Sequence, residues 1–267
     1  MQPAERLRRE LGAEARSRID EIEVFKLIDS TNSHLMRSAV PDAGRSRLAL
    51  ADDQSAGRGR HDRRWETAPG SCLCLSLAYT FERVPEYLAV LTLLMGVATA
   101  RVLNGLGLDA VRLKWPNDIV VNDRKLGGLL AETQLKPDRR VTVVAGIGVN
   151  LHLPPDLRIQ SSSAWAHAAT DLASCLGDAP DRDLLAARVT DELIALFLAF
   201  ETGDIAGALD DWRSYDWLLG RSIRVEDTGT THVGTAAGID DKGLLLLDTP
   251  SGRQRIIAGT ISLQDVR

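Results

Sequence analysis

An arginine-rich segment, residues 57–65, holds the side chains whose chemistry is most readily interpreted. It contains four arginines and two glycines. Arginine donates paired hydrogen bonds to phosphate and carboxylate oxygens. Glycine lets the backbone approach a ligand closely, which a solvated surface loop does not need. The segment therefore predicts a loop that binds a small anion.

A second segment, Lys-Trp-Pro-Asn-Asp at residues 114–118, lies about fifty residues further on, and Lys125 follows it. Lys114 and Lys125 can neutralise phosphate charge. Asp118 can hold a metal ion such as Mg²⁺ or orient a nucleophile. The alternative is a strand with a bulge and a proline-imposed bend, with no ligand. Together with the arginine loop, these residues favour ATP-dependent activation of a carboxylic acid.

Glycines also recur in two predicted strands, at residues 127–128 and at Gly146 and Gly148. They indicate either a ligand packed on the sheet or a crowded crossing of chains, and both interpretations stay open. Asn150 offers an amide edge suited to a base such as adenine. Trp165 is either a helix-packing residue or an aromatic plate over a base.

Trp65 ends the arginine loop and can either wall a binding site or anchor the loop in the core. On chemistry alone the anchor is the better interpretation, since a buried indole fixes the end of a loop well. The five histidines show no Ser/His/Asp grouping and no metal-ligand spacing, so a hydrolytic triad is poorly supported.

Length and composition limit the class of protein. The 267 residues suffice for one large domain with a small one appended. A net charge of −5 gives no footprint for nucleic acid. The three cysteines fit a reducing compartment, and the charged N-terminus is not a signal peptide. The apolar run at residues 88–103 is short for a membrane span and predicts a core helix. We therefore expect a cytoplasmic protein without membrane or DNA contacts.

These residues need a framework, and the hydrophobic pattern supplies an α/β one. Strands and helices alternate through residue 201, with N-cap chemistry at residues 29–32 and a hairpin turn at residues 122–124. The predicted strands are 22–28, 48–52, 72–79, 111–121, 126–134 and 141–150. The predicted helices are a surface helix at 4–18, then 30–39, 85–105, 161–176 and 181–201.

The pattern changes after residue 216. Short strand-like runs separated by Gly and Asp turns appear at 222–226, 232–239, 244–247 and 254–263. They resemble a small barrel of roughly fifty residues. We predict two domains, residues 1–216 and 217–267.

At these motifs the chain resembles the biotin protein ligase family, from about residue 28 to the C-terminus. The matching positions are 29–32, Gln54 with 56–60, Arg63 and Trp65, 114–118, 125–128 with Glu132, 146–150 and 238–240. The resemblance implies a class II synthetase-like biotin/lipoate ligase fold, with a mixed sheet flanked by helices and a C-terminal SH3-like β-barrel. It also implies that the protein can pair as a homodimer.

The resemblance further implies a two-step reaction. Biotin and Mg-ATP give biotinyl-5'-AMP and pyrophosphate. The adenylate then biotinylates one lysine of a biotin carboxyl carrier protein or domain of a carboxylase. ATP and Mg²⁺ are thus the implied cofactors, and biotin is the substrate.

The family's functional residues map onto this sequence one by one. The implied catalytic residues are Lys125, Lys114, Asp118 and Arg60, with Asp118 also the implied Mg²⁺ ligand. The implied biotin-binding residues are Ser30, Thr31, Gln54, Gly57, Arg58, Trp65, Gly128, Gly146 and Gly148. The implied nucleotide-binding residues are Arg58, Arg60, Arg63, Lys125, Asn150 and Trp165.

The sequence departs from the family pattern at three positions. Asp62 replaces a glycine that is frequent in the family's loop, which adds a negative charge there. Cys74 replaces an aromatic residue that lines the biotin pocket in relatives. Gln264 stands where some relatives place an arginine towards the nucleotide.

Three other functions are less compatible with this sequence than a monofunctional ligase. Lipoate and octanoate ligases share the chemistry, but the complete arginine loop and the 114–118 segment favour biotin. A biotin-responsive repressor carries an N-terminal winged helix, and only about twenty residues precede the first matched strand. A catalytically dead binding protein is expected to lose Lys125 or Asp118, and both are present.

Overall fold

The computed structural model describes the chain except residues 1, 62, 160–168, 228 and 264–267. A seven-stranded sheet in the order β1-β2-β3-β7-β6-β5-β4 forms its larger part. β1 and β2 are parallel, and the other neighbouring strands are antiparallel. The predicted mixed sheet is therefore confirmed. Its strands are β1 (Ile19–Phe25), β2 (Ser46–Ala51), β3 (Cys72–Phe81), β4 (Val111–Lys114), β5 (Asp118–Val121), β6 (Arg124–Leu135) and β7 (Val141–Asn150).

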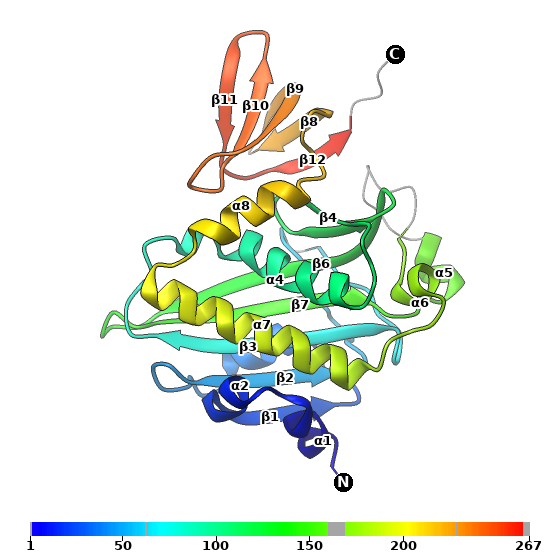
Figure 1. Cartoon of the computed structure of the whole chain (residues 1–267), viewed down its shortest axis with the longest axis vertical. Coiled ribbons are helices and arrows are strands. Elements are labelled where there is room, and N and C mark those ends of the chain that lie inside the picture. Colours follow the sequence, from blue (N-terminus) through cyan, green and yellow to red (C-terminus); the bar gives the residue numbers. More distant parts are fainter. Residues whose placement is uncertain (1, 62, 160–168, 228, 264–267) are drawn as a thin grey trace.

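Helices cover the two faces of the sheet unequally (Figure 1). On one face lie α4 (Leu91–Gly105) and α7 (Arg182–Thr202). A short 3-10 helix, η1 (Leu88–Val90), leads directly into α4. On the other face α3 (Thr31–Arg37) packs over Ala49, Ala78 and Val144. This one short helix covers only part of its face, so the remainder is available for a cavity.

Buried apolar residues explain the central strands. β3 is buried along its whole length, since both of its faces lie inside the protein. The helix Leu88–Gly105 has the length and hydropathy of a membrane span, yet 67% of that window is buried within the protein. It packs as a core helix, as the sequence predicts.

The N-terminal segment differs from the single surface helix predicted at residues 4–18. It forms two helices, α1 (Pro3–Glu10) and α2 (Ala13–Arg18). Leu7, Leu11 and Ala15 are buried in the main core. Leu7 lies on α1, Leu11 is the C-cap after it, and Ala15 lies on α2. Each helix therefore buries an apolar side chain against α7 and β1, which makes the segment a cover for the core and not a free surface helix.

The predicted strand at residues 111–121 is also wrong as a single element. It is two antiparallel strands, β4 and β5, with Lys114 paired to Asp118 in register. Residues 115–117 form the turn, and the Trp115–Pro116 peptide bond is cis. Proline lacks a ladder donor, so it occupies the turn and not a strand. The predicted turn at residues 122–124 is confirmed, with positive φ at Asn122 and Asp123.

Two further helical predictions need correction. A helix at residues 206–215 was missed and forms α8 (Ala206–Tyr215). The helix predicted from residue 161 is described only in its later part, where α6 (Leu172–Leu176) begins after the N-cap Asp171. α5 (Pro155–Ile159) is a single short turn before the undescribed residues.

The C-terminal strands form a separate five-stranded antiparallel sheet in the order β11-β10-β9-β8-β12. It lies at the end of the molecule beyond α8 and β4 (Figure 1). Among the described residues the edge strands β11 and β12 do not pair, so the barrel is not closed. The last predicted strand, 254–263, is two strands, and the domain boundary at residue 216 remains a prediction. The strands are β8 (Ser222–Asp227), β9 (Thr230–Ile239), β10 (Leu245–Thr249), β11 (Gly252–Ile256) and β12 (Thr260–Leu263).

Candidate active site

A cavity of about 850 Å³ lies on the sheet face that α3 leaves uncovered. The arginine loop, the β4–β5 turn, β6, β7 and the C-terminal sheet all contribute to its wall. Most of the predicted site residues in the described part of the chain meet here. The predicted residues lining it are Ser30, Thr31, Gln54, Arg58, Arg60, Arg63, Trp65, Lys114, Asp118, Lys125, Gly128, Gly146, Gly148 and Asn150.

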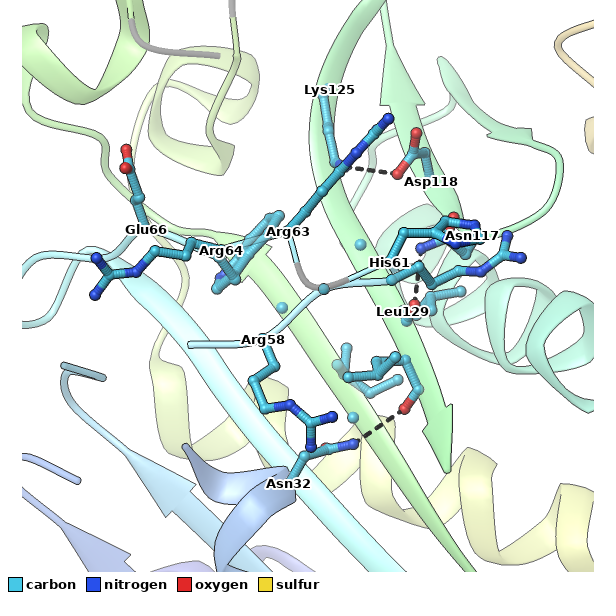
Figure 2. Close-up of a pocket in the computed structure, with 18 of the residues that line it drawn as sticks. Asn32, Arg58, His61, Arg63, Arg64, Glu66, Asn117, Asp118, Lys125 and Leu129 are labelled. Atoms are coloured by element: carbon cyan, nitrogen blue, oxygen red, sulfur yellow. Dashed lines mark hydrogen bonds and ion pairs between the residues drawn. The ribbon is translucent and has the colours of Figure 1, made fainter. Parts of the chain in front are cut away.

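The charged end of the cavity is built by the β4–β5 hairpin and the start of β6. Lys125 Nζ lies 2.6 Å from Asp118 Oδ1, and Lys114 Nζ lies 3.7 Å from Asp118 Oδ2 (Figure 2). Hairpin register and the short 122–124 turn bring these three side chains together from sequence positions that are eleven residues apart at most. The carboxylate therefore holds both ammonium groups in place.

Burial and charge shift the titration of these groups. Burial lowers the pKa of Lys114 to about 8, although the neighbouring Asp118 carboxylate opposes this. Burial alone raises the pKa of Asp118, but Lys125 and Lys114 outweigh it, so the net pKa is lowered. Asp118 is consequently an anion at neutral pH, surrounded by cations.

Arg60 adds a further positive charge at this end. Burial lowers the pKa of its guanidinium, and attraction to Asp118 works against that change. Lys114, Lys125 and Arg60 thus all act on one carboxylate, and Arg63 adds to them. An excess of positive charge in a partly enclosed cavity stabilises phosphate oxygens and the charge that develops during their substitution.

The arginine loop is a small hairpin with defined anchors. Trp65 N–H donates to Gly57 O at 2.9 Å, and Gly59 N–H donates to Arg63 O at 2.7 Å. A Cβ on Gly57 would lie 2.3 Å from Trp65 O, so the loop itself requires glycine there. Gly57 is not among the residues that line this cavity, and its predicted biotin contact stays a prediction. Arg63 Nη2 reaches across to Thr260 Oγ1 in the C-terminal sheet at 3.0 Å.

Trp65 forms a wall of the cavity. Its Nε1 donates to Cys72 Sγ at 3.3 Å, and Lys125 Nζ lies 5.6 Å from the ring centroid. The ring fills the space over Gly148, where a Cβ would lie 2.7 Å from it. The sequence favoured an anchor in the core, but glycine on β7 admits the ring beside the cavity.

The opposite end of the cavity is polar and uncharged. Ser30 caps α3 by accepting from Ser33 N–H at 3.3 Å. Thr31 N–H donates to Gln54 Oε1 at 2.9 Å. The N-terminus of α3 therefore presents hydroxyl and amide groups to the cavity, as the predicted cap at residues 29–32 implies.

Cys74 lines the cavity beside this floor and is buried. Its hydrogen bond with Cys72, together with burial, raises the pKa of the Cys74 thiol well above its ordinary value. It is therefore a neutral, unreactive side chain of small volume. Asp62, Trp165 and Gln264 lie outside the described residues, so their predicted roles have no structural counterpart here.

Comparison with known proteins agrees with this site. Residues 24–150 match the Biotin/lipoate A/B protein ligase family, and residues 218–264 match the Biotin protein ligase C terminal domain. The Bifunctional ligase/repressor BirA of Escherichia coli is 32% identical over 91% of this chain and 74% of its own length. The Biotin--[acetyl-CoA-carboxylase] ligase of Mycobacterium tuberculosis is 31% identical over 90% of this chain and 88% of its own length. The chain belongs to the biotin protein ligase family.

The fold comparison extends this family assignment to the whole structure. A biotin protein ligase from Aquifex aeolicus, solved in complex with biotin and ATP, superposes with a TM-score of 0.74. It is 25% identical, and the alignment covers 92% of this chain and 99% of that one. The biotin ligase fold with its C-terminal SH3-like part is therefore present here.

Two site predictions concerning the nucleotide and its metal need comment. Asn150 Nδ2 donates to Thr170 O at 2.9 Å, so one of its two amide N–H groups is used within the protein. No group of three His, Cys, Asp or Glu residues within the described ranges could hold a metal ion. Asp118 is a single carboxylate, which fits Mg²⁺ that arrives with ATP and takes most of its ligands from phosphates and water.

Sequence reasoning assigned no role to several residues of this ligase site. Ser76 and Asn32 line the cavity, and Glu132 binds Arg58. Ser76 could have been singled out from the sequence, because it is a polar residue in the middle of an otherwise apolar strand. Thr260 had none, because nothing in its local sequence indicates contact with a loop about two hundred residues earlier.

Proposed function

We propose that this protein is an ATP-dependent biotin protein ligase that makes biotinyl-5'-AMP and transfers biotin to a lysine of a biotin carboxyl carrier protein. One observation carries the proposal beyond family membership. A polar, uncharged floor and a cluster of lysines around Asp118 occupy the two ends of a single cavity of about 850 Å³. A ligand with a neutral polar head and a carboxylate fits such a cavity.

In the first step a carboxylate oxygen of biotin attacks the α-phosphorus of Mg-ATP. A C(O)O–P bond forms, and the bond to pyrophosphate breaks. Lys125, Lys114 and Arg60 supply the positive charge that brings two anions together and stabilises the pentacovalent phosphorus. Mg²⁺ enters as part of the nucleotide substrate, and Asp118 is the proposed protein oxygen beside it.

In the second step the carrier lysine attacks the carbonyl carbon of the adenylate. The lysine ammonium first loses one proton to solvent. A C–N bond then forms, the C–O bond to AMP breaks, AMP leaves, and the nitrogen releases a second proton to solvent. The Asp118 carboxylate attracts the incoming ammonium group and keeps Lys125 in place. The arginine loop excludes water from the mixed anhydride, which would otherwise hydrolyse.

The remaining residues divide between the two substrates. Ser30, Thr31 and Gln54 bind the polar head of biotin, and Trp65 and the glycines of β6 and β7 line its path. Arg58, Arg60 and Arg63 form the loop that covers it, and Arg63, Lys125 and Asn150 face the nucleotide. The lipoate alternative has weaker support, because the match at residues 218–264 is to a domain named for biotin protein ligases alone.

Mass spectrometry of the products formed from Mg-ATP tests this proposal without a carrier. Biotin is expected to give biotinyl-5'-AMP, whereas octanoate and lipoate are expected to give none. Lys125→Ala removes the cation paired with Asp118 and is expected to lower adenylate formation by about 10²-fold or more. Lys136→Ala, a lysine beyond the end of β6, is the control and should retain full activity. An octanoyl or lipoyl adenylate would instead place the protein in the lipoyl branch.

The partner and compartment assignments stay predictions. The carrier is expected to be the biotin carboxyl carrier part of a carboxylase, and labelled biotin transferred to purified carrier measures this directly. A homodimer is expected to scatter light with twice the chain mass. Cytoplasmic location without DNA binding is likewise an expectation from sequence.

A further inference from the structure

We propose that Ser76, Asn32 and Glu132 are positioning residues that couple the floor of the biotin site to the arginine loop through a continuous hydrogen-bond chain. We call this chain the relay. It rests on the proposed function for the identity of the ligand, but its existence is a property of the protein itself. None of these three residues belongs to the set assigned above to substrate binding.

The relay is continuous from the loop to the floor. Arg58 binds both oxygens of Glu132, with Nη2–Oε1 and Nη1–Oε2 distances of 2.9 Å. Asn32 Nδ2 donates to Glu132 Oε2 at 3.1 Å. Ser76 Oγ lies 2.6 Å from Asn32 Oδ1 and 2.7 Å from Thr31 Oγ1. In Figure 2 the Arg58 side chain accordingly extends from the loop towards Asn32.

The hydrogen bonds in the relay have one consistent direction. The Glu132 carboxylate can only accept, so Asn32 must turn its NH₂ towards it. Asn32 Oδ1 then faces Ser76, and Ser76 has to use its single hydroxyl proton on that oxygen. The lone pairs of Ser76 are left to accept from the Thr31 hydroxyl at 2.7 Å. A charge on β6 thereby sets the polarity of a hydroxyl at the cavity floor.

The direction of the relay has a consequence for the ligand. The Thr31 hydroxyl lies 2.7 Å from Ser76 Oγ and 3.2 Å from Gln54 Oε1. When it donates to Ser76, the closer of the two, its oxygen is left as an acceptor in the cavity lining. Gln54 Oε1 is occupied by Thr31 N–H at 2.9 Å. The floor is thus prepared for a ligand N–H group before the ligand arrives, which reduces the cost of ordering it on binding.

Burial makes the relay cooperative. Ser76 is 1% exposed and Asn32 is 4% exposed. A buried polar group that loses its partner is destabilising, so these two residues depend on each other. At the loop end of the relay, the Glu132 side chain is 19% exposed and that of Arg58 is 41% exposed. Removing the Ser76 hydroxyl leaves Asn32 Oδ1 without its donor, so the Asn32 amide is then held only through Nδ2, by Glu132 Oε2 at 3.1 Å and Leu130 O at 3.4 Å.

Gly146 on β7 provides the space for the relay. A Cβ at this position would lie 2.2 Å from Asn32 Oδ1. The glycine that the sequence interpreted as room for a ligand therefore serves at least as much to admit Asn32. The space beside Gly146 on β7 is filled by the Asn32 side-chain amide, which the relay holds in one orientation.

Hydrogen exchange of the ligand-free protein tests the relay without any substrate. Ser76→Ala lies away from the loop, yet it is expected to raise exchange of the peptide covering residues 57–65 by about fivefold, since one lost hydrogen bond weakens the Arg58 anchor by about 1 kcal/mol. Thr80→Ala is the matched control, because Thr80 lies on the same strand and pairs with Thr142 Oγ1 at 2.9 Å, away from the relay. It should leave the loop unchanged at similar cost in stability. Equal loop exchange in Ser76→Ala and wild type overturns the proposal.

A double-mutant cycle on biotin affinity tests the coupling directly. Ser76→Ala and Glu132→Gln are each expected to weaken biotin binding by about 5–30-fold, the equivalent of one lost buried hydrogen bond. These residues do not touch and are joined through Asn32. In a relay the double variant binds biotin no more than about threefold more weakly than the worse single variant. Losses that multiply would show two independent residues and overturn the relay.

The two proposals fail in different ways. If the wild-type protein binds no biotin, the proposed function is wrong, and the exchange of residues 57–65 alone decides the relay. If the wild type binds biotin and forms the adenylate while Ser76→Ala leaves both loop and affinity unaltered, the function stands and the relay is wrong.

Discussion

Lys114 is the residue whose environment departs most from that of an ordinary lysine. Its side chain is 4% exposed, and two of its neighbours, Lys125 and Arg63, carry the same charge. Burial lowers its pKa to about 8, and Asp118 is what keeps it from falling further. A lysine in this state is charged at neutral pH but close to losing its proton, so its contribution to phosphate binding depends on pH.

We expect kcat/KM for ATP in adenylate formation to fall as pH rises through about 8, because deprotonated Lys114 no longer neutralises phosphate. The protonated form, present below pH 8, is the active one. Lys114→Arg keeps the charge at all accessible pH values, so it should abolish the alkaline decline while lowering the rate at pH 7 by about tenfold through altered geometry. Adenylate formation measured from pH 6 to 10 checks this. An unchanged decline in Lys114→Arg would assign the titration to another group.

Residue types were more predictable than residue contacts. The lysines, Asp118 and the arginines could be chosen from sequence because few other roles suit such charges at close spacing. The sequence could not distinguish Gly57 from the glycines that line the cavity. Glycine is needed both where a tight loop leaves no room for a Cβ and where a ligand packs on the backbone. The amide of Asn150 was predicted to meet a base. Its hydrogen bond to Thr170 O could not be predicted, because the acceptor lies twenty residues later in the chain.

The β4–β5 hairpin carries charged residues of the active site and also contacts the C-terminal part of the protein. It carries Lys114 and Asp118 on its two strands, and its turn holds Trp115, which is 3% exposed. Trp115 Nε1 donates at 3.0 Å to Gly243 O, in the connection between β9 and β10 of the C-terminal sheet. The small sheet thus supports the hairpin from behind, on the side away from the substrates.

Trp115→Phe should therefore impair the use of ATP much more than the binding of biotin. It keeps an aromatic ring but leaves Gly243 O without its donor, so we expect a loss of about 1–3 kcal/mol in unfolding free energy. Displacement of the hairpin should lower kcat/KM for ATP by about tenfold and change the biotin Kd by less than about twofold, since the biotin floor lies on other elements. Trp212→Phe, in α8, controls for loss of buried indole volume. Equal effects on both substrates would contradict a specific role for the hairpin.

At this scale the sequence predicted the kinds of element better than their pairing. β7 and α7 were placed within one residue at each end, because long apolar periodicity and clear caps determine them. The 111–121 strand was misjudged because a hairpin with a three-residue turn keeps an alternating pattern on both sides. α8 was missed since its apolar face is weak without the α4 surface against which it packs.

At the scale of the whole molecule, both sheets build the active site. Glu226 and Thr260 of the small sheet line the cavity, and Arg63 of the large part donates to Thr260. The connection between the two parts runs through Asp216 and Trp217, with Trp217 Nε1 donating to Asp123 Oδ1 at 2.7 Å. No local pattern predicts such contacts, because they join residues that are far apart in the chain.

Asp216 makes this junction sensitive to pH. Its Oδ1 accepts from Leu218 N–H at 2.8 Å, while its buried Oδ2 has no hydrogen-bond partner among the described residues. Burial raises its pKa to about 6. The folded protein therefore binds more protons at this group than the unfolded chain does between pH 4 and 6. Stability contributed by Asp216 is present at low pH and is lost as pH rises through 6.

Asp216→Asn should remove this penalty, because the amide keeps the acceptor for Leu218 without a buried charge. We expect the variant to be more stable than wild type by about 2 kcal/mol at pH 7, with the difference shrinking towards zero at pH 4. Urea unfolding at pH 4.5, 5.5, 6.5 and 7.5 measures it. Asp241→Asn, at a side chain 99% exposed, should show no such trend. A difference for Asp216→Asn that is constant with pH would mean that the junction holds this carboxylate without cost, and that its lone oxygen is satisfied by solvent.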